Sequence, residues 1–306
     1  MNWMLKKLTI VGLIFMTLSV ASHATVASLP ENDTQAINTA LNAGELDKAE
    51  TLVEALVVKY PTHPEAHYIR GSVMGAQASD SIFSALSYAK KAKASMQQAV
   101  ALAPQNPKYL AGLITFYTVA PGIAGGDMEE ANRLIDKLMT IDKREGTFKR
   151  LDYYRANEQM EAFEQLLEES LVTFAGIPDF YFVAGLHAQQ QEQAEQALEL
   201  FTLGSQQPAL TPASETARLQ SLYQIGRTAQ ISGLALADGK AALREFMTQR
   251  GDNDQLPPID WARVRLAQLH VATDQVEQAR ELVALVDASE DERLADEVRK
   301  LQRQLR

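Results

Sequence analysis

Apolar residues recur every three to four positions along most of the chain, the period that places side chains on one face of an α-helix. No segment alternates with period two for long enough to predict a sheet. Residues 113–120 are rich in β-branched and aromatic side chains, but they fall where a helix of a repeated pattern is due, so we predict a buried helix there. The repeated pattern consists of three small or large apolar residues on one face of a helix. It occurs at Ala49, Val53 and Leu56, at Ala92, Met96 and Ala99, at Ala197, Phe201 and Gly204, and at Ala279, Val283 and Val286.

A partner helix is expected upstream of each of these helices, and its small residues predict close packing. Gly185 precedes Ala197 by twelve positions, and Ala267 precedes Ala279 by the same interval, whereas Ile37 breaks the rule before Ala49. Small residues at facing positions allow two antiparallel helices to approach closely. Helix pairs that restart about every 34 residues are typical of a helical-repeat protein.

In these features the chain resembles the tetratricopeptide repeat (TPR) family. The resemblance is carried by "GELDKAETLVEALVVKYP", "HYIRGSVMG", "YFVAGLHAQQQEQAEQALELF" and "WARVRLAQLHVATDQVEQARELV", and it extends over most of residues 31–290. It implies an all-α fold, a right-handed α-solenoid of about six antiparallel helix pairs with a charged capping helix at 291–305. We expect one domain over residues 25–306, with weak consensus at 145–175 and a lengthened turn within 212–250.

The resemblance also implies a site, because the first helix of each TPR pair faces a groove that holds peptides or partner helices. The positions of the repeat that face this groove correspond to aromatic, amide, hydroxyl and basic residues, which suit peptide recognition. We therefore expect a protein or peptide partner in this groove. The groove positions are Tyr68, Ser72, Lys108, Ala111, Thr115, Phe182, Leu186, Gln189, Trp261, Val264 and Gln268, with Tyr223, Arg227 and Gln230 in the lengthened unit.

The first 24 residues have the pattern of a secretory signal peptide. Lys6 and Lys7 precede an uncharged apolar run over residues 8–20, and Ser22 and Ala24 occupy the −3 and −1 positions of a cleavage site. The run is shorter than the ~20 residues needed to span a bilayer, so we expect cleavage after Ala24 and no stable membrane insertion afterwards. The sequence thus predicts export, and we expect the protein in the periplasm of a Gram-negative bacterium.

Composition narrows the classes of partner and cofactor. The chain has no cysteine, which excludes disulfides, thiolate metal sites and the lipid anchor of a bacterial lipoprotein. Its formal net charge is −10, and removal of residues 1–24 with two lysines and no acid makes it −12. Such a balance argues against nucleic acid as a partner, because nucleic acids are bound through excess Lys and Arg. We expect no cofactor.

One glycine-rich stretch, "VAPGIAGGD" at 119–127, resembles a loop that could cradle phosphate. No Lys–Ser/Thr pair follows Gly126, and the spacing is not G-x-G-x-x-G. Asp127 and Glu130 suit the N-cap and N3 positions of a following helix, so carboxylates would occupy the amides that a phosphate needs. We predict an enlarged turn, five residues longer than in a minimal repeat, formed by Pro121, Gly122, Gly125, Gly126 and Asp127.

The remaining candidates for chemistry are isolated. His63 and His67 are four apart, but no third ligand is near, so we expect no metal site there. His187 and His270 lie within first-helix patterns without a nucleophile, and no catalytic spacing occurs. The sequence therefore favours a non-catalytic scaffold of the bacterial cell envelope that binds a protein partner. The alternative is a small-ligand-binding or transport accessory protein with a pocket near the turn at 121–126 or under a long helix at 81–103.

Overall fold

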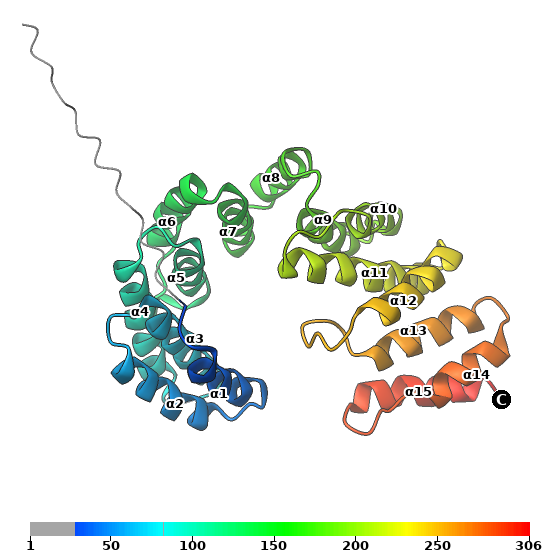
Figure 1. Cartoon of the computed structure of the whole chain (residues 1–306). Coiled ribbons are helices and arrows are strands. Elements are labelled where there is room, and N and C mark those ends of the chain that lie inside the picture. Colours follow the sequence, from blue (N-terminus) through cyan, green and yellow to red (C-terminus); the bar gives the residue numbers. More distant parts are fainter. Residues whose placement is uncertain (1–27, 82) are drawn as a thin grey trace, which may run out of the picture. The chain divides into compact units, whose positions relative to one another are not determined.

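The computed structural model describes residues 28–81 and 83–306, so the predicted signal peptide lies outside the described residues. In the described part all regular structure is helical, and residues 113–120 fall mainly in a helix, as predicted. No helix in this part is long and apolar enough to cross a membrane. The fifteen α-helices (Figure 1) are α1 (Glu31–Asn42), α2 (Leu46–Lys59), α3 (Pro64–Asp80), α4 (Ala85–Leu102), α5 (Pro107–Val119), α6 (Met128–Ile141), α7 (Lys143–Ala156), α8 (Met160–Thr173), α9 (Pro178–Gln190), α10 (Ala194–Ser205), α11 (Pro212–Ser232), α12 (Leu236–Gln249), α13 (Ile259–Val271), α14 (Val276–Ala284) and α15 (Glu292–Gln304).

Counted along the chain, the described helices make seven successive pairs followed by α15, where the sequence pattern predicted about six pairs and a cap. The segment of weakest consensus, 145–175, contains α7 and α8. The chain divides into two compact units. The first unit contains the residues up to Phe116 together with Ala120–Gly126, and the second contains Tyr117–Val119 and Asp127–Arg306.

Small residues allow the helices of a pair to approach closely, as the sequence predicted. A Cβ atom added to Gly185 on α9 would lie 2.5 Å from Cε1 of Phe201 on α10. A Cβ atom added to Gly226 on α11 would lie 2.2 Å from Cγ of Leu243 on α12. Because both partner side chains are fully buried, neither can move aside for a larger residue.

The core of the first unit is built from the facing sides of α1 to α4. Ile37, Ala49, Val53 and Met74 are almost completely buried there, together with Ala92 of α4. Ala49 and Val53 belong to the periodic pattern that predicted α2. The hydrophobic period of the sequence is thus the buried face of the helices.

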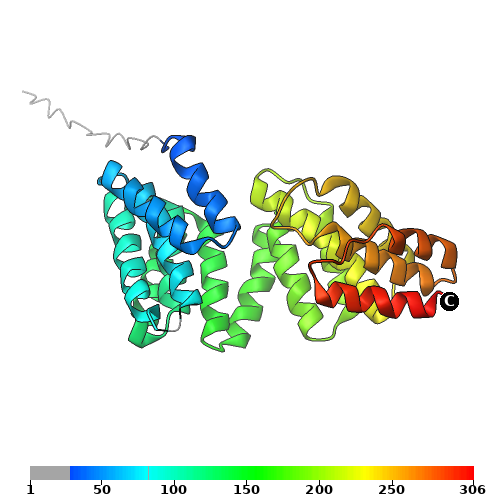
Figure 2. The ribbon, with the colours of Figure 1, turned by 90° about the horizontal axis from the view of Figure 1, so that it is seen from below.

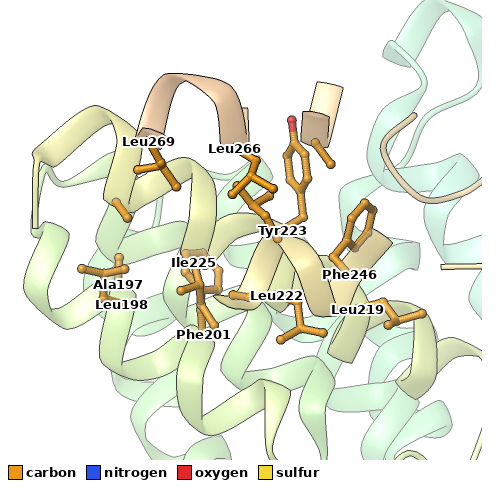
Figure 3. Close-up of a cluster of buried hydrophobic side chains, with 14 of the residues drawn as sticks. Ala197, Leu198, Phe201, Leu219, Leu222, Tyr223, Ile225, Phe246, Leu266 and Leu269 are labelled. Carbon is orange, nitrogen blue, oxygen red and sulfur yellow. The ribbon is translucent and has the colours of Figure 1, made fainter. Parts of the chain in front are cut away.

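The largest core of the second unit lies among α9 to α13. Phe201 and Phe246 are fully buried, and Figure 3 shows them with Leu222, Ile225 and Leu266 in one cluster of side chains. The last helix, α15, drawn in red at the C-terminal end in Figure 2, extends this packing. Leu294 and Leu301 of α15 are buried against α13 and α14. The rest of α15 is mostly charged or polar, as expected of a helix that ends a stack of repeats.

Candidate protein-binding surface

Polar side chains connect the first helices of the pairs in the second unit. Gln189 of α9 donates from Nε2 to Thr228 Oγ1 of α11 at 2.8 Å, and Arg227 of α11 donates to Gln189 Oε1 at 2.9 Å. Arg265 of α13 donates to Gln230 Oε1 of α11 at 2.7 Å. We call this row of side chains the first-helix face of the second unit. It consists of Gln189, Arg227, Thr228, Gln230, Arg265, Gln268 and Glu297.

The row continues to the last helix. Gln268 of α13 accepts a hydrogen bond from Arg265 at 3.2 Å and donates to Glu297 Oε2 of α15 at 2.9 Å. Hydrogen bonds from Lys300 and from Gln268 lower the pKa of Glu297, and the nearby charge of Arg265 acts in the same direction. Glu297 therefore stays ionised and fixes the end of the row.

The two arginines of the first-helix face are held by amides rather than by acids. Arg227 donates to Gln189 and Gln224, and Arg265 donates to Gln230 and Gln268. Among the described residues, no carboxylate lies within 4.0 Å of either guanidinium group. Neither guanidinium group forms a direct ion pair in this part of the chain, although the charge of Arg265 is near enough to Glu297 to lower the pKa of that carboxyl group. Guanidinium groups in this state can still donate to carbonyl or carboxylate oxygens of a bound segment.

Two predicted aromatic residues flank this row and are half-buried. The indole Nε1 of Trp261 donates to Asp291 Oδ2 at 3.0 Å, and the guanidinium of Arg265 lies 5.5 Å from the centre of the Trp261 ring. Hydrogen bonds from Leu294 N–H and from Trp261 lower the pKa of Asp291, which caps α15. Phe182 packs on the core of this unit, with its ring centre 6.2 Å from that of Phe201. Leu186 packs there too.

Three predicted groove residues are core residues instead. Tyr223 is only 7% exposed, and its ring lies 5.4 Å from that of Phe246 in the cluster of Figure 3. Val264 is fully buried, and Ala111 of α5 is 7% exposed. The family register places these side chains toward a groove, but neighbouring helices cover them, so they cannot contact a partner.

In the first unit, the four predicted groove residues other than the buried Ala111 lie on α3 and α5. The Tyr68 ring lies 5.2 Å from that of Tyr109, and Lys108 Nζ lies 5.0 Å from the centre of the Tyr68 ring. A Cβ atom on Gly112 would lie 2.6 Å from Tyr68 Cε2, so the missing side chain makes room for this ring. Ser72 and Thr115 are exposed. The side chains of Tyr68 and Lys108 thus pack on each other, and the exposed hydroxyl groups of Ser72 and Thr115 lie on the same two helices.

The enlarged turn is compact and self-bonded. A 3-10 helix, η1 (Gly122–Ala124), forms its centre, and the amides of Ala124 and Gly126 both donate to Pro121 O, at 2.8 and 3.1 Å. Gly125 has a φ of +100°, and a Cβ atom on Gly126 would lie 1.7 Å from the carbonyl oxygen of Ala120. The backbone itself therefore requires glycine at positions 125 and 126, whereas Gly122 has open space around it.

The two ends of this turn explain its extra length. Lys93 of the long helix α4 donates to Gly125 O at 3.2 Å, so the turn covers the side of the extended helix. Asp127 accepts a hydrogen bond from Glu130 N at 3.0 Å and caps α6, as the sequence predicted, while the Glu130 carboxylate pairs with Arg133 at 2.6 Å. A hollow of about 400 Å³ on the neighbouring surface of α6 is lined by polar and charged side chains, Asp127 among them.

The four histidines of the described part have different surroundings. His63 caps α3 by accepting from Glu65 N at 3.3 Å, and His67 Nε2 lies 2.8 Å from Pro61 O. His270 is buried, and since Arg244 can only donate to its Nε2 at 3.1 Å, its Nδ1–H donates to Gln275. Burial lowers the pKa of His270, and the charges of Arg244 and Lys240 act in the same direction. No group of three metal-ligating side chains is assembled among the described residues.

Sequence reasoning missed a cleft in the second unit. A cleft of about 330 Å³ lies among α8, α9 and α10, and His187 is one of its lining residues. His187 Nε2 lies 3.1 Å from Glu164 Oε1 of α8. No motif in the sequence marks this cleft, because its lining residues come from three helices and are brought together only by their packing.

Comparison with known proteins supports the fold. No protein-family model matches the sequence, and no curated protein matches it either. Among solved structures, the chain is similar to the Cut9–Hcn1 hetero-tetramer of the APC/C (14% identity, TM-score 0.52, 88% of this chain and 48% of that one). It is also similar to yeast Tom70 (13% identity, TM-score 0.51, 90% and 61%). A tetratricopeptide repeat protein from Parabacteroides merdae matches at 15% identity and a TM-score of 0.43 over 90% of this chain and 98% of that one.

These structural neighbours are TPR-repeat proteins, so the chain has a TPR-like all-helical fold. It spans about half the length of the matched APC/C chain and about three fifths of that of Tom70. Since identities near 14% show the fold alone, function has to be argued from the site.

Proposed function

We propose that this chain is a non-catalytic binding protein of the bacterial cell envelope and that it holds a segment of a protein partner on the first-helix face of the second unit. The single observation that carries the proposal is the row of amide and guanidinium groups in which Arg227 and Arg265 donate to glutamine oxygens of the neighbouring first helices. These groups are fixed by hydrogen bonds between helices, so they are organised before a partner binds. Trp261 and Phe182 add apolar area beside them.

The location in the envelope is part of the same proposal and is supported by the sequence of residues 1–24. Lys6 and Lys7, the apolar run and the small residues at Ser22 and Ala24 favour export and cleavage. Amino-terminal sequencing of the protein purified from a periplasmic fraction tests this proposal, with Thr25 as the expected first residue. A protein that stays in the cytoplasm with Met1 in place would contradict it.

A cross-linking experiment tests the binding surface. A photoreactive amino acid at position 224 of the full-length protein, in cells, should form a discrete adduct with a partner protein, because Gln224 lies beside Arg227. The double variant R227Q/R265Q removes both guanidinium charges and should reduce the adduct at least about tenfold, the loss expected for two charge-assisted hydrogen bonds.

The matched control is R299Q on α15, which also removes a charge but pairs with Asp296 on an exposed surface. This variant should leave the adduct unchanged. If R227Q/R265Q and R299Q both retained the adduct, or if no adduct formed at position 224, the first-helix face would not be the binding surface.

A further inference from the structure

The cleft among α8, α9 and α10 has an aliphatic floor. Leu167 and Leu171 of α8 and Leu200 of α10 line it, together with alanines of α9. Its volume of about 330 Å³ lies at the lower end of the range for ligand pockets. A floor of this kind favours an apolar chain of a few methylene groups, because burial removes such a chain from water.

The rim of the cleft is acidic and rich in acceptors. Glu164 and Glu168 line it from α8, and no Lys or Arg is among its lining residues. Gln191, Gln193 and Gln196 complete the rim, and their amide groups can also offer oxygen acceptors. Arg155, which lies 5.8 Å from the Phe163 ring beside the cleft, is already paired with Asp152 at 2.7 Å. The cleft therefore carries a local negative charge next to an apolar surface.

Most of these polar groups have no partner inside the protein. The side chains of Glu168, Gln191, Gln193 and Gln196 make no hydrogen bond or ion pair with another described residue, while Glu164 contacts only the imidazole of His187. The ring centre of His187 lies 5.2 Å from that of the buried Phe163, and the two rings are tilted by 58°. The acceptors on the rim are therefore available to a ligand.

We propose that this cleft binds a cationic aliphatic group, the side chain of a lysine from the protein partner. The methylene stem of lysine lies along Leu167, Leu171 and Leu200, and its ammonium group is held by Glu164 and Glu168. Lysine matches both surfaces at once, because its stem is apolar and its charged head stays at the polar edge. The inference rests on the proposed function in one respect, namely that the lysine belongs to a protein partner. A free aliphatic diamine offers the same chemistry.

Nuclear magnetic resonance titration of the mature chain tests this inference without the partner. N-acetyl-lysine methylamide is the probe, and N-acetyl-norleucine methylamide, which has a similar aliphatic chain without charge, is its control. The lysine probe should shift the His187 imidazole signals and the side-chain amides of Gln191 and Gln193. Its apparent affinity should exceed that of the norleucine probe at least about fivefold, and added salt should reduce the difference.

Matched variants on α8 locate the charge. E164Q/E168Q should weaken binding of the lysine probe at least about fivefold. E161Q/E169Q makes the same change of charge on the same helix at two residues that do not line the cleft, and it should have no effect. Circular dichroism checks that both variants are folded. Equal affinity for the two probes, or an unchanged affinity in E164Q/E168Q, would overturn the inference.

Cadaverine, a free diamine with a similar chain, separates the two sources of the cation. If cadaverine binds more than tenfold tighter than the lysine probe, the cleft serves a free amine and the assignment to a protein partner is wrong. The outcome is separate from the test of the first-helix face. Lysine binding without a cross-linked partner would contradict the proposed function alone, and a cross-linked partner without lysine binding would contradict this inference alone.

Discussion

The helix pairs α7–α8 and α9–α10 follow each other in the second unit and differ at the two positions that set their spacing. Their turns give a common register, since Glu158 and Glu192 both adopt a left-handed conformation with φ of 57° and 59°. Seven residues before and five residues after this position, α9–α10 has Gly185 and Ala197. The α7–α8 pair has Leu151 and Phe163 there, and both are 2% exposed.

This difference explains why the sequence pattern is weak in α7–α8 and why that pair is more loosely packed. Gly185 and Ala197 allow α9 and α10 to pack closely, whereas the buried side chains of Leu151 and Phe163 occupy the space between α7 and α8. Accordingly, α7 and α8 pack less extensively on each other than α9 and α10 do. The cleft lies beside this looser pair, where α8 meets α9 and α10.

The largest expected effect on stability comes from truncating Phe163, the large buried residue of the α7–α8 pair. Phe163→Ala should lower the free energy of unfolding by about 3–5 kcal/mol, because it leaves a cavity where a fully buried ring was packed. Urea unfolding followed by circular dichroism measures it. Val172→Ala on the same helix, 82% exposed, is the control and should change stability by less than about 0.5 kcal/mol. Similar values for the two variants would show that Phe163 does not support α8.

A smaller effect is expected from adding bulk to the tighter pair. Gly185→Ala should destabilise by about 1–3 kcal/mol, because its Cβ atom would enter the buried ring of Phe201. Gly75 of α3 has open space around it, so Gly75→Ala should instead stabilise by about 0.4–1 kcal/mol. Thermal unfolding of both variants gives the comparison. A stabilised Gly185→Ala variant would mean that close approach does not distinguish α9–α10.

The smallest effect concerns the turns, which the two pairs share. Glu158→Gly and Glu192→Gly should each stabilise by about 0.5–1 kcal/mol, since glycine adopts a positive φ without the strain of a side chain. Gly44, with φ of 71° in the first unit, provides the reverse change, and Gly44→Ala should destabilise by a similar amount. Melting temperatures measure all three. Opposite signs for the two glutamate variants would show that the turns, and not the facing residues, separate the pairs.

The order of apolar and polar residues was enough to predict the helices and much of their local geometry. The hydrophobic period fixes which face of a helix is buried, as at Ala49 and Val53, and it outweighed the β-branched composition of residues 113–120. The cap at Asp127 and the close approach at Gly185 also follow from residues a few positions apart. These features depend on local interactions or on one helix pair, so they can be predicted from residues that are close together in the sequence.

The packing of whole helices settles which polar residues meet and which predicted site residues are accessible. Arg227 and Gln189 come together across 38 positions of the chain, and Tyr223 is covered by Phe246 of α12 and by the rest of its core cluster. The cleft beside His187 is formed by side chains of three helices, α8, α9 and α10. Such outcomes depend on how side-chain volumes add up between repeats, and the period of a single helix does not contain that information.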